Sequence, residues 1–285
     1  MKKFKVLIIG KNSFIGSNIH YFLKTKYSCK IKSFTENITN KLHKYDYIIN
    51  CSINPKYIKY KYDEKNDYDL KIIKKIKGTK TKFIFLSTRK IYFASPNLKE
   101  NSKKKLLNNY EKNKYITENK INKLHKNNSV ILRISNLIGY KKKNPRKKHL
   151  TYVDYLIKML NEGKIYKNSK RYKDFLDIGS FSKIIYLVIK NEVIGTYNAS
   201  IGKKIYLDEI NSWILHYFKP KKKLKIYNLD NENDKESFFL NNSKLLKKIN
   251  LKISKQKLKN ECLKLSKKLF KKINFINKKN MNNIT

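Results

Sequence analysis

The feature that most constrains the fold is a short apolar run, residues 6–9, that ends at Gly10. The run is rich in β-branched side chains, which is typical of a strand buried on both faces of a parallel sheet. Gly16 follows at the start of an expected helix over residues 17–26, where a missing side chain lets helix and strand approach closely. This stretch therefore predicts a strand, a tight turn and a helix in that order.

The amino end of the expected helix is suited to binding a phosphate group. Its first N–H groups have no partner within the helix, and the helix dipole is positive there. Two glycines six residues apart also fit an ordinary β-turn-α unit, so their spacing alone decides little. Alternating strands and helices follow this unit, which favours a dinucleotide-binding turn.

The remaining pattern predicts an α/β fold: a doubly wound parallel Rossmann sheet with a smaller C-terminal α/β lobe. Further strands are expected over residues 29–33, 46–51, 82–87 and 130–135, with a helix over 110–124. The gap between the strands at 29–33 and 46–51 is short. The additional strand and helix of the usual Rossmann unit are therefore expected to be trimmed.

Length and composition fit one large α/β unit or slightly more. The chain has 285 residues, 40% of them hydrophobic, and no apolar run approaches the ~20 residues of a membrane-spanning helix. The three cysteines, Cys29, Cys51 and Cys262, are scattered and lack metal-binding spacing. We therefore expect a reduced cytoplasmic protein with no metal site and no membrane partner.

The net charge of +47 raises the alternative of an RNA-associated protein. Of the 68 basic residues, however, only Arg89, Arg133, Arg146 and Arg171 are arginine. Selection for binding phosphates or base edges favours arginine, whose guanidinium donates two parallel hydrogen bonds. The lysines are spread along the whole chain, as in proteins of A/T-biased genomes. We therefore expect no specific nucleic-acid partner.

The first turn also carries a family resemblance. Residues 10–16, Gly-Lys-Asn-Ser-Phe-Ile-Gly, resemble the Gly-x-x-Gly-Phe-Ile-Gly of extended short-chain dehydrogenases/reductases, the NAD-dependent epimerase/dehydratase group. Ser13 stands where that pattern has its middle glycine. The resemblance implies that NAD or NADP is bound by two segments. These are Gly10, Ser13, Phe14, Ile15 and Gly16 in the turn, and Cys51, Ser52 and Ile53 on the nicotinamide side.

The end of the second expected strand leaves NAD and NADP equally open. NAD-binding Rossmann units usually carry an acidic residue there, which binds the ribose hydroxyls. In this chain the acid is absent or displaced to Glu36, and Lys32 lies nearby.

Short-chain dehydrogenases use a Tyr-x-x-x-Lys helix, whose spacing places both side chains on one helical face. The lysine charge stabilises the phenolate, so that the tyrosine can exchange protons with a substrate. Five of the 21 tyrosines have a lysine four residues later: Tyr57, Tyr110, Tyr166, Tyr186 and Tyr217. Only Tyr110 lies in the helix between the strands at 82–87 and 130–135, so placement selects Tyr110 and Lys114.

The segments around Tyr110 resemble the family in the same order. Residues 83–92 resemble the strand ending in Ser-Ser/Thr-x-x-Val-Tyr-Gly, and residues 132–139 resemble Leu-Arg-x-x-Asn-x-x-Gly. The resemblance spans most of residues 3–200 and implies a role for each matching residue. Tyr110 exchanges the proton, and Lys114 tunes Tyr110 and holds the nicotinamide ribose.

Three further positions match the family's substrate contacts. Thr88 is expected to hydrogen-bond the reacting oxygen, while Asn136 and Lys173 are expected to hold the diphosphate side of the substrate. Lysine at position 173 replaces a family arginine and would bind as a point charge.

The resemblance also divides the chain. Residues 1–140 are expected to form the NAD(P)-binding Rossmann domain, to which residues 173–200 return. Residues 141–275 are expected to form the substrate-binding lobe, and residues 276–285 a disordered tail.

The activity implied is that of an NAD(P)-dependent epimerase, which acts on a nucleotide-activated sugar through a keto intermediate. An NAD(P)H-dependent nucleotide-sugar 4-ketoreductase and a catalytically quiet Rossmann binding module remain as alternatives. Dehydration is not expected, because Arg89 and Lys90 follow Thr88 where family 4,6-dehydratases carry an Asp-Glu pair. Cationic side chains cannot serve as that acid and base at neutral pH. The identity of the sugar and the formation of a homodimer are left open.

Overall fold

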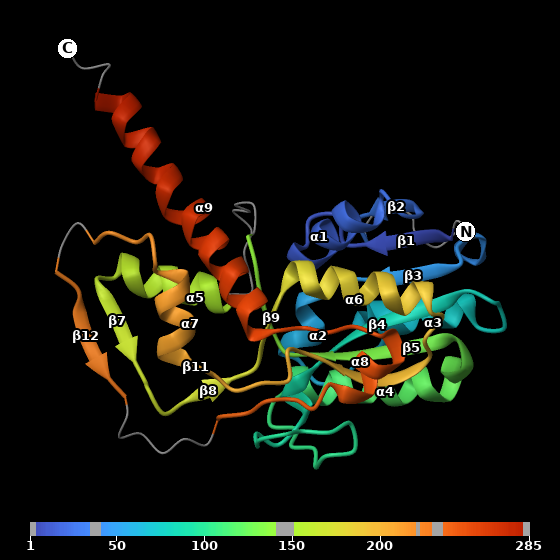
Figure 1. Ribbon diagram of the computed structural model, residues 1–285. Coiled ribbons are helices and arrows are strands. Elements are labelled where there is room, and N and C mark those ends of the chain that lie inside the picture. Colours follow the sequence, from blue (N-terminus) through green and yellow to red (C-terminus); the bar gives the residue numbers. More distant parts are fainter. Residues whose placement is uncertain (1–3, 35–40, 141–150, 221–222, 230–235, 282–285) are drawn as a thin grey trace.

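The computed structural model describes residues 4–34, 41–140, 151–220, 223–229 and 236–281. Its centre is a six-stranded sheet in which every neighbouring pair is parallel (Figure 1). The strands lie in the order β2 (Ser28–Lys32), β1 (Lys5–Ile9), β3 (Tyr47–Asn50), β4 (Lys82–Thr88), β5 (Ser129–Ile134) and β10 (Gly195–Ala199). The predicted doubly wound Rossmann sheet is confirmed.

Helices cover both faces of the sheet, and alternate side chains of a strand enter different cores. In β1, Val6 and Ile8 belong to one hydrophobic core, and Leu7 and Ile9 belong to the other. The first core includes residues of α1 (Phe14–Leu23) and α6 (Ile178–Lys190), the second residues of α3 (Tyr68–Ile76) and α4 (Asn109–His125). Burial on both faces explains why the strands read as continuous apolar runs.

The strand order reverses beside β1. The chain passes outward from β1 to β2, then returns to the other side of β1 and continues through β3 toward β10. Ligands of such sheets bind outside the carboxyl ends of the strands at this switch point. β2 is an edge strand, and the 3-10 helix η1 (Leu42–Lys44) is the only element between β2 and β3 within the described residues. The short connection agrees with the expected trimming.

Residues after β5 build a second group of elements beside the sheet (Figure 1). Its strands pair as β6 (Asn136–Ile138) with β9 (Phe175–Asp177), β7 (Lys164–Lys167) with β12 (Lys225–Asn228), and β8 (Tyr172–Lys173) with β11 (Ile205–Tyr206). Its helices are α5 (Tyr152–Asn161), α7 (Leu207–Ile214) and α9 (Lys255–Met281). Phe175, Trp213 and Leu258 are buried in a separate hydrophobic cluster. Between β9 and β11 the chain returns to the main sheet through α6 and β10.

Two boundaries differ from the expected ones. Helix α1 begins at Phe14, three residues early, because Ser13 is its N-cap and accepts a hydrogen bond from the Gly16 N–H at 2.7 Å. Helix α9 runs to Met281 and overlaps the range 276–285 that the sequence predicts to be disordered. Each residue added to an established helix gains one backbone hydrogen bond, which favours this extension.

None of the helices in the described part of the chain combines the length and the apolar character needed to span a bilayer. The described residues also contain no group of three or more His, Cys, Asp or Glu side chains that could hold a metal ion.

Candidate active site

In the turn between β1 and α1, two glycines lie so close to neighbouring atoms that a side chain would not fit. Gly10 has a φ of +118°, and a Cβ atom there would lie 3.0 Å from the Cys51 carbonyl carbon. A Cβ atom on Gly16 would lie 2.8 Å from Ser13 Oγ and closer still to the Gly10 backbone. With Gly16 N–H bonded to Ser13, the earlier N–H groups of α1 have no partner within the helix. Close backbone approach and free N–H groups at a helix start are the features that favour binding of a phosphate group.

Within the described residues, no acidic side chain lies at the end of β2, which is next to this turn. The Lys32 carbonyl accepts hydrogen bonds from the N–H groups of Gly10 at 2.7 Å and Lys11 at 3.2 Å. Glu36, the displaced acid of the sequence prediction, lies outside the described residues.

A cavity of about 400 Å³ opens at the carboxyl ends of β3, β4 and β5. It brings together most of the predicted cofactor and catalytic residues from segments far apart in the sequence. They are Phe14, Ile15, Cys51, Ser52, Ile53, Thr88, Tyr110, Lys114 and Asn136. Gly10, Ser13 and Gly16 form the adjoining turn, and Lys173 lines a second cavity.

Tyr110 and Lys114 lie one turn apart on α4, and both line the first cavity. All five tyrosines with a lysine four residues later are described, and of these Tyr110 alone lines this cavity. Tyr57, for comparison, is 3% exposed and its hydroxyl is 2.7 Å from Thr117 Oγ1. Of the five candidates, Tyr110 is therefore the one that lies among the other predicted site residues.

Thr88 is placed so that its hydroxyl can donate into the cavity. Its Oγ1 accepts a hydrogen bond from the Lys90 N–H at 3.2 Å, which leaves the hydroxyl proton free for another partner. The preceding Ser87 cannot take this role, because its hydroxyl is 2.5 Å from Glu118 Oε1 and donates to it. The geometry explains why the second residue of the pair is the candidate.

Lys114 has a buried acidic neighbour that the sequence reasoning missed. Its Nζ donates to the Leu86 carbonyl oxygen at 3.0 Å and lies 3.6 Å from Asp69 Oδ2. Burial raises the pKa of Asp69 to about 6, while the charge of Lys114 opposes that rise. In the sequence, Asp69 looks like any acid in the first turn of a helix, where acids favour the helix dipole.

A buried ion pair between Arg133 and Glu118 joins β5 to α4, the helix that carries Tyr110 and Lys114. Arg133 donates from Nη2 to Glu118 Oε2 at 2.6 Å and from Nη1 to the Tyr92 hydroxyl at 2.8 Å. The Tyr92 hydroxyl in turn donates to Asn198 Oδ1 at 2.8 Å, which links the segment after β4 to β5 and β10. Tyr92, Glu118 and Arg133 therefore connect these elements and do not line the cavity that contains Tyr110.

A second cavity of about 650 Å³ adjoins the first and shares Lys90 and Asn136 with it. Lys173 lines it, and its Nζ lies 3.2 Å from Glu236 Oε2. Burial lowers the pKa of Lys173. The Arg89 guanidinium carbon lies 3.7 Å from the centre of the Phe238 ring, and burial lowers the Arg89 pKa to about 10. This cavity is therefore lined by four cations, Arg89, Lys90, Lys105 and Lys173, and two acids, Glu111 and Glu236, beside the candidate catalytic residues.

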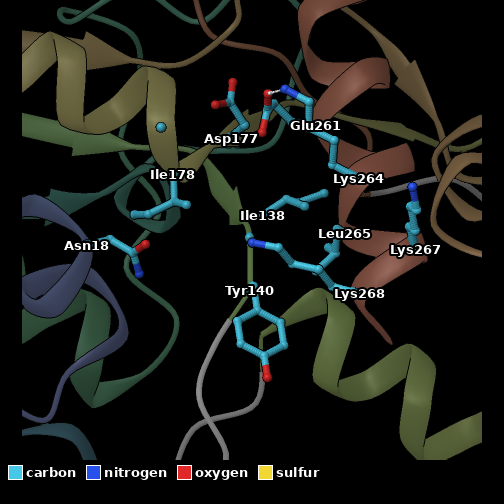
Figure 2. A pocket seen from close by; sticks show the side chains of 12 residues that line it. Asn18, Ile138, Tyr140, Asp177, Ile178, Glu261, Lys264, Leu265, Lys267 and Lys268 are labelled. Carbon is cyan, nitrogen blue, oxygen red and sulfur yellow. Dashed lines mark hydrogen bonds and ion pairs between the residues drawn. The ribbon is translucent and has the colours of Figure 1, made fainter. Parts of the chain in front are cut away.

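A larger cavity of about 980 Å³ lies elsewhere, between α1, the start of α6 and α9 (Figure 2). Ile138, Ile178 and Leu265 give it apolar walls, and Lys264, Lys267 and Lys268 line it from α9. It shares no described residue with the cavity that holds Tyr110. The chemistry of the lining, and not the size of the cavity, identifies the candidate active site.

Residues 32–200, more than half of the chain, match the model of the NAD dependent epimerase/dehydratase family. No curated protein is significantly similar to this chain in sequence.

Solved structures share the fold over nearly the whole chain. The UDP-N-acetylglucosamine 4-epimerase from Methanobrevibacter ruminantium M1, in complex with UDP-N-acetylmuramic acid, is 20% identical with a TM-score of 0.75, over 94% of this chain and 98% of that one. The UDP-glucose 4-epimerase from Thermotoga maritima, with UDP-glucose, is 16% identical with a TM-score of 0.73, over 94% and 99%. The dTDP-4-dehydrorhamnose reductase from Bacillus anthracis, in complex with NADP, is 19% identical with a TM-score of 0.70, over 95% and 100%.

Proposed function

The chain belongs to the NAD-dependent epimerase/dehydratase family, and from this premise we propose that it is an NAD(P)-dependent epimerase of a nucleotide-activated sugar. The observation that carries the proposal is the cavity lined by Thr88, Tyr110 and Lys114 at the switch point of the sheet. An acid–base tyrosine, a lysine and a hydroxyl donor beside a dinucleotide turn form a site for oxidising an alcohol and reducing the ketone again.

The cofactor would be held by the turn and by the end of β3. Gly10 and Gly16 leave the space that a pyrophosphate needs, and the amino end of α1 favours its charge. Cys51, Ser52 and Ile53 line the cavity where the nicotinamide would lie. When bound, NAD(P) accepts a hydride from the substrate carbon and can return it. Lys32 beside the turn is compatible with NADP, so both cofactors belong to the proposal.

The side chains of the cavity move the proton. As hydride leaves the sugar carbon, Tyr110 takes the hydroxyl proton, and the charge of Lys114 favours the phenolate that does so. Thr88 donates a hydrogen bond to the same oxygen, with its own oxygen held by the Lys90 N–H. When the hydride returns to the other face of the rotated keto sugar, Tyr110 gives the proton back, so protons and electrons balance over one turnover.

The second cavity would bind the nucleotide diphosphate. Asn136 lies at its junction with the first cavity, and Lys173 offers a positive charge further along. The elements of residues 141–275 that surround Lys173 are, in the same proposal, the substrate-binding lobe. Residues 1–140, with the returning segment 173–200, are the cofactor domain.

A ketoreductase is the second candidate function. The NADP complex of the reductase from Bacillus anthracis has the same fold, and β2 here carries Lys32 near the turn instead of an acid. A dehydratase is disfavoured because Arg89 and Lys90, which are cations, follow Thr88. A catalytically quiet binding module would share the fold and the cofactor but not the turnover.

The test is incubation of the purified protein with a panel of UDP-, GDP- and dTDP-sugars and either cofactor, followed by chromatography of the sugars. Interconversion of two epimers without net cofactor consumption is the expected result. Stoichiometric loss of NADPH with a 4-keto sugar would change the assignment to reductase. Cofactor binding without turnover on any sugar of the panel would favour the quiet module.

A further inference from the structure

Lys114 sits in a small buried enclosure at the base of the candidate active site. Its side chain and that of Asp69 are each only 7% exposed, and the two charges are 3.6 Å apart. The Leu86 carbonyl accepts from Nζ at 3.0 Å, and the Nζ atom lies 4.4 Å from the centre of the Phe85 ring. The centre of the Tyr57 ring lies 5.8 Å from Nζ, so the ammonium has one counter-charge, one carbonyl and two aromatic rings around it.

The other carboxylate oxygen of Asp69, Oδ1, is held by a hydrogen bond from Asn50. Asn50, at the end of β3, donates from Nδ2 to Asp69 Oδ1 at 2.8 Å. The same Asn50 accepts from the Ser52 N–H at 3.0 Å and donates to the Ser52 carbonyl at 3.1 Å. Asp69 therefore joins Lys114 on α4 to the segment that lines the nicotinamide side of the cavity.

A buried ammonium without a counter-charge is unstable. Desolvation disfavours the charged form, and a carboxylate within about 4 Å compensates for it. The catalytic use of Lys114 requires the charge, because only the ammonium stabilises the phenolate of Tyr110 one helical turn away. A lysine in this enclosure therefore depends on its acidic neighbour both for its charge and for its place.

We propose that Asp69 is a positioning residue: it keeps the Lys114 ammonium charged and held at the base of the cavity, so that its field acts on Tyr110. This inference rests on the role proposed above for Lys114. It assigns to Asp69 no contact with substrate or cofactor.

The direction in which the titration of Tyr110 moves distinguishes this role from a direct effect of the Asp69 charge on Tyr110. Replacing Asp69 by asparagine removes a negative charge, and that change alone would make the Tyr110 phenolate easier to form. If Asp69 maintains the Lys114 ammonium, the replacement also removes the positive charge, and the phenolate becomes harder to form. The net direction of the Tyr110 titration therefore reports which effect dominates.

The experiment places 3-fluorotyrosine at position 110 and follows its ¹⁹F signal from neutral to alkaline pH. The samples are the parent, D69N, K114M and D69N/K114M. We expect D69N to move the titration midpoint to higher pH by about one unit, and K114M to move it at least as far. In the K114M background, D69N should give no further rise, because the charge it maintains is already absent. This readout needs no sugar substrate, so failure of the epimerase proposal would not hide its result.

Asp67 provides the matched control. It is as deeply buried at the start of the same helix, but it accepts from Thr117 Oγ1 at 2.6 Å and from the Tyr62 hydroxyl at 2.9 Å. D67N should therefore move the midpoint much less than D69N. An equal rise in D67N would overturn the specific role of Asp69, as would a fall or no change in D69N alongside a rise in K114M. An unchanged midpoint in K114M would overturn the role of Lys114 and the positioning role with it.

Urea unfolding supplies a second measurement in case D69N alone folds poorly. K114M leaves the Asp69 carboxylate buried without its counter-charge, so adding D69N to K114M should recover stability. Further loss of stability in the double variant would overturn the pairing.

Discussion

A Cβ atom on Gly16 would lie 2.5 Å from the carbonyl oxygen of Gly10, so the first helix and the first strand meet without room for a side chain. Gly16→Ala should therefore push α1 from β1 and disturb the pyrophosphate cradle. We expect the affinity for NADH and NADPH to fall by at least about tenfold, the loss of roughly one good charge-assisted contact. Fluorescence titration measures it, with Ser17→Ala, an exposed position on the same helix, as control. Equal binding by the two variants would contradict the cofactor assignment.

The acid–base role of Tyr110 predicts a large loss of turnover without loss of cofactor. Tyr110→Phe removes the hydroxyl that exchanges the proton, and general acid–base groups typically contribute about 10²–10⁴-fold. We expect the rate on whichever sugar proves to be the substrate to fall within that range, with NAD(P)H affinity nearly unchanged. Tyr186→Phe is the matched control, because Tyr186 also has a lysine four residues later but packs against the core beneath α6. Full activity in Tyr110→Phe would show that another tyrosine is catalytic.

Lys173 and Glu236 should affect the binding of the nucleotide in opposite directions. Lys173→Met removes a cation from the second cavity and should weaken UDP binding by roughly 3–10-fold, a modest effect because the site is partly solvated. Glu236→Gln releases Lys173 from its 3.2 Å ion pair and should strengthen UDP binding. Isothermal titration calorimetry with UDP compares the two variants. Weaker binding in Glu236→Gln would mean that the glutamate itself contacts the ligand.

The ionisation of Asp69 predicts a pH-dependent stability. Burial raises the pKa of Asp69 to about 6 in the folded protein, above the value of about 4 expected in the unfolded chain. The folded state then binds the proton more tightly, so the contribution of Asp69 to stability is greatest below about pH 4 and falls as the pH rises through about 6. The free energy of unfolding of the parent minus that of D69N should fall by on the order of 2 kcal/mol over this window. Urea unfolding at both ends of the window measures it, and parallel pH dependences would contradict the shift.

The buried pair of Arg133 and Glu118 predicts a stability effect without a catalytic one. Arg133→Met leaves the Glu118 carboxylate buried and unpaired, which should cost about 3–5 kcal/mol. The double variant Arg133→Met/Glu118→Gln should recover part of that loss, because no charge then remains unpaired. Urea unfolding of the single and double variants tests the coupling. A larger loss in the double variant than in Arg133→Met would contradict the ion-pair account.

The sequence predicted the elements whose signals are local. The strand before Gly10 and the Tyr110–Lys114 pair could be found from periodicity, order and resemblance, because both depend on residues close together in the chain. The start of α1 was missed, because Ser13 was read as a replaced glycine and not as the N-cap that it is. A serine directly before the apolar residues Phe14 and Ile15 is the sequence signal for an N-cap at this position.

Other features could not be predicted, because they depend on how distant elements pack. Asp69 becomes the neighbour of Lys114 only when α3 and α4 lie side by side on the sheet. Likewise, Arg133 falls in a segment that resembles a family motif, and only the structure shows that it forms a buried ion pair with Glu118.

The edge position of β2 has a consequence for solubility. An exposed edge strand offers unpaired backbone groups to other chains, and lysines along such a strand discourage this pairing. β2 carries Lys30 and Lys32, whereas the opposite edge, β10, is in contact with α8 (Ser243–Ile249). In the described part of the chain no further strand pairs with β2, so these two lysines place positive charge where another chain would add a strand, an effect that requires neither nucleic acid nor substrate.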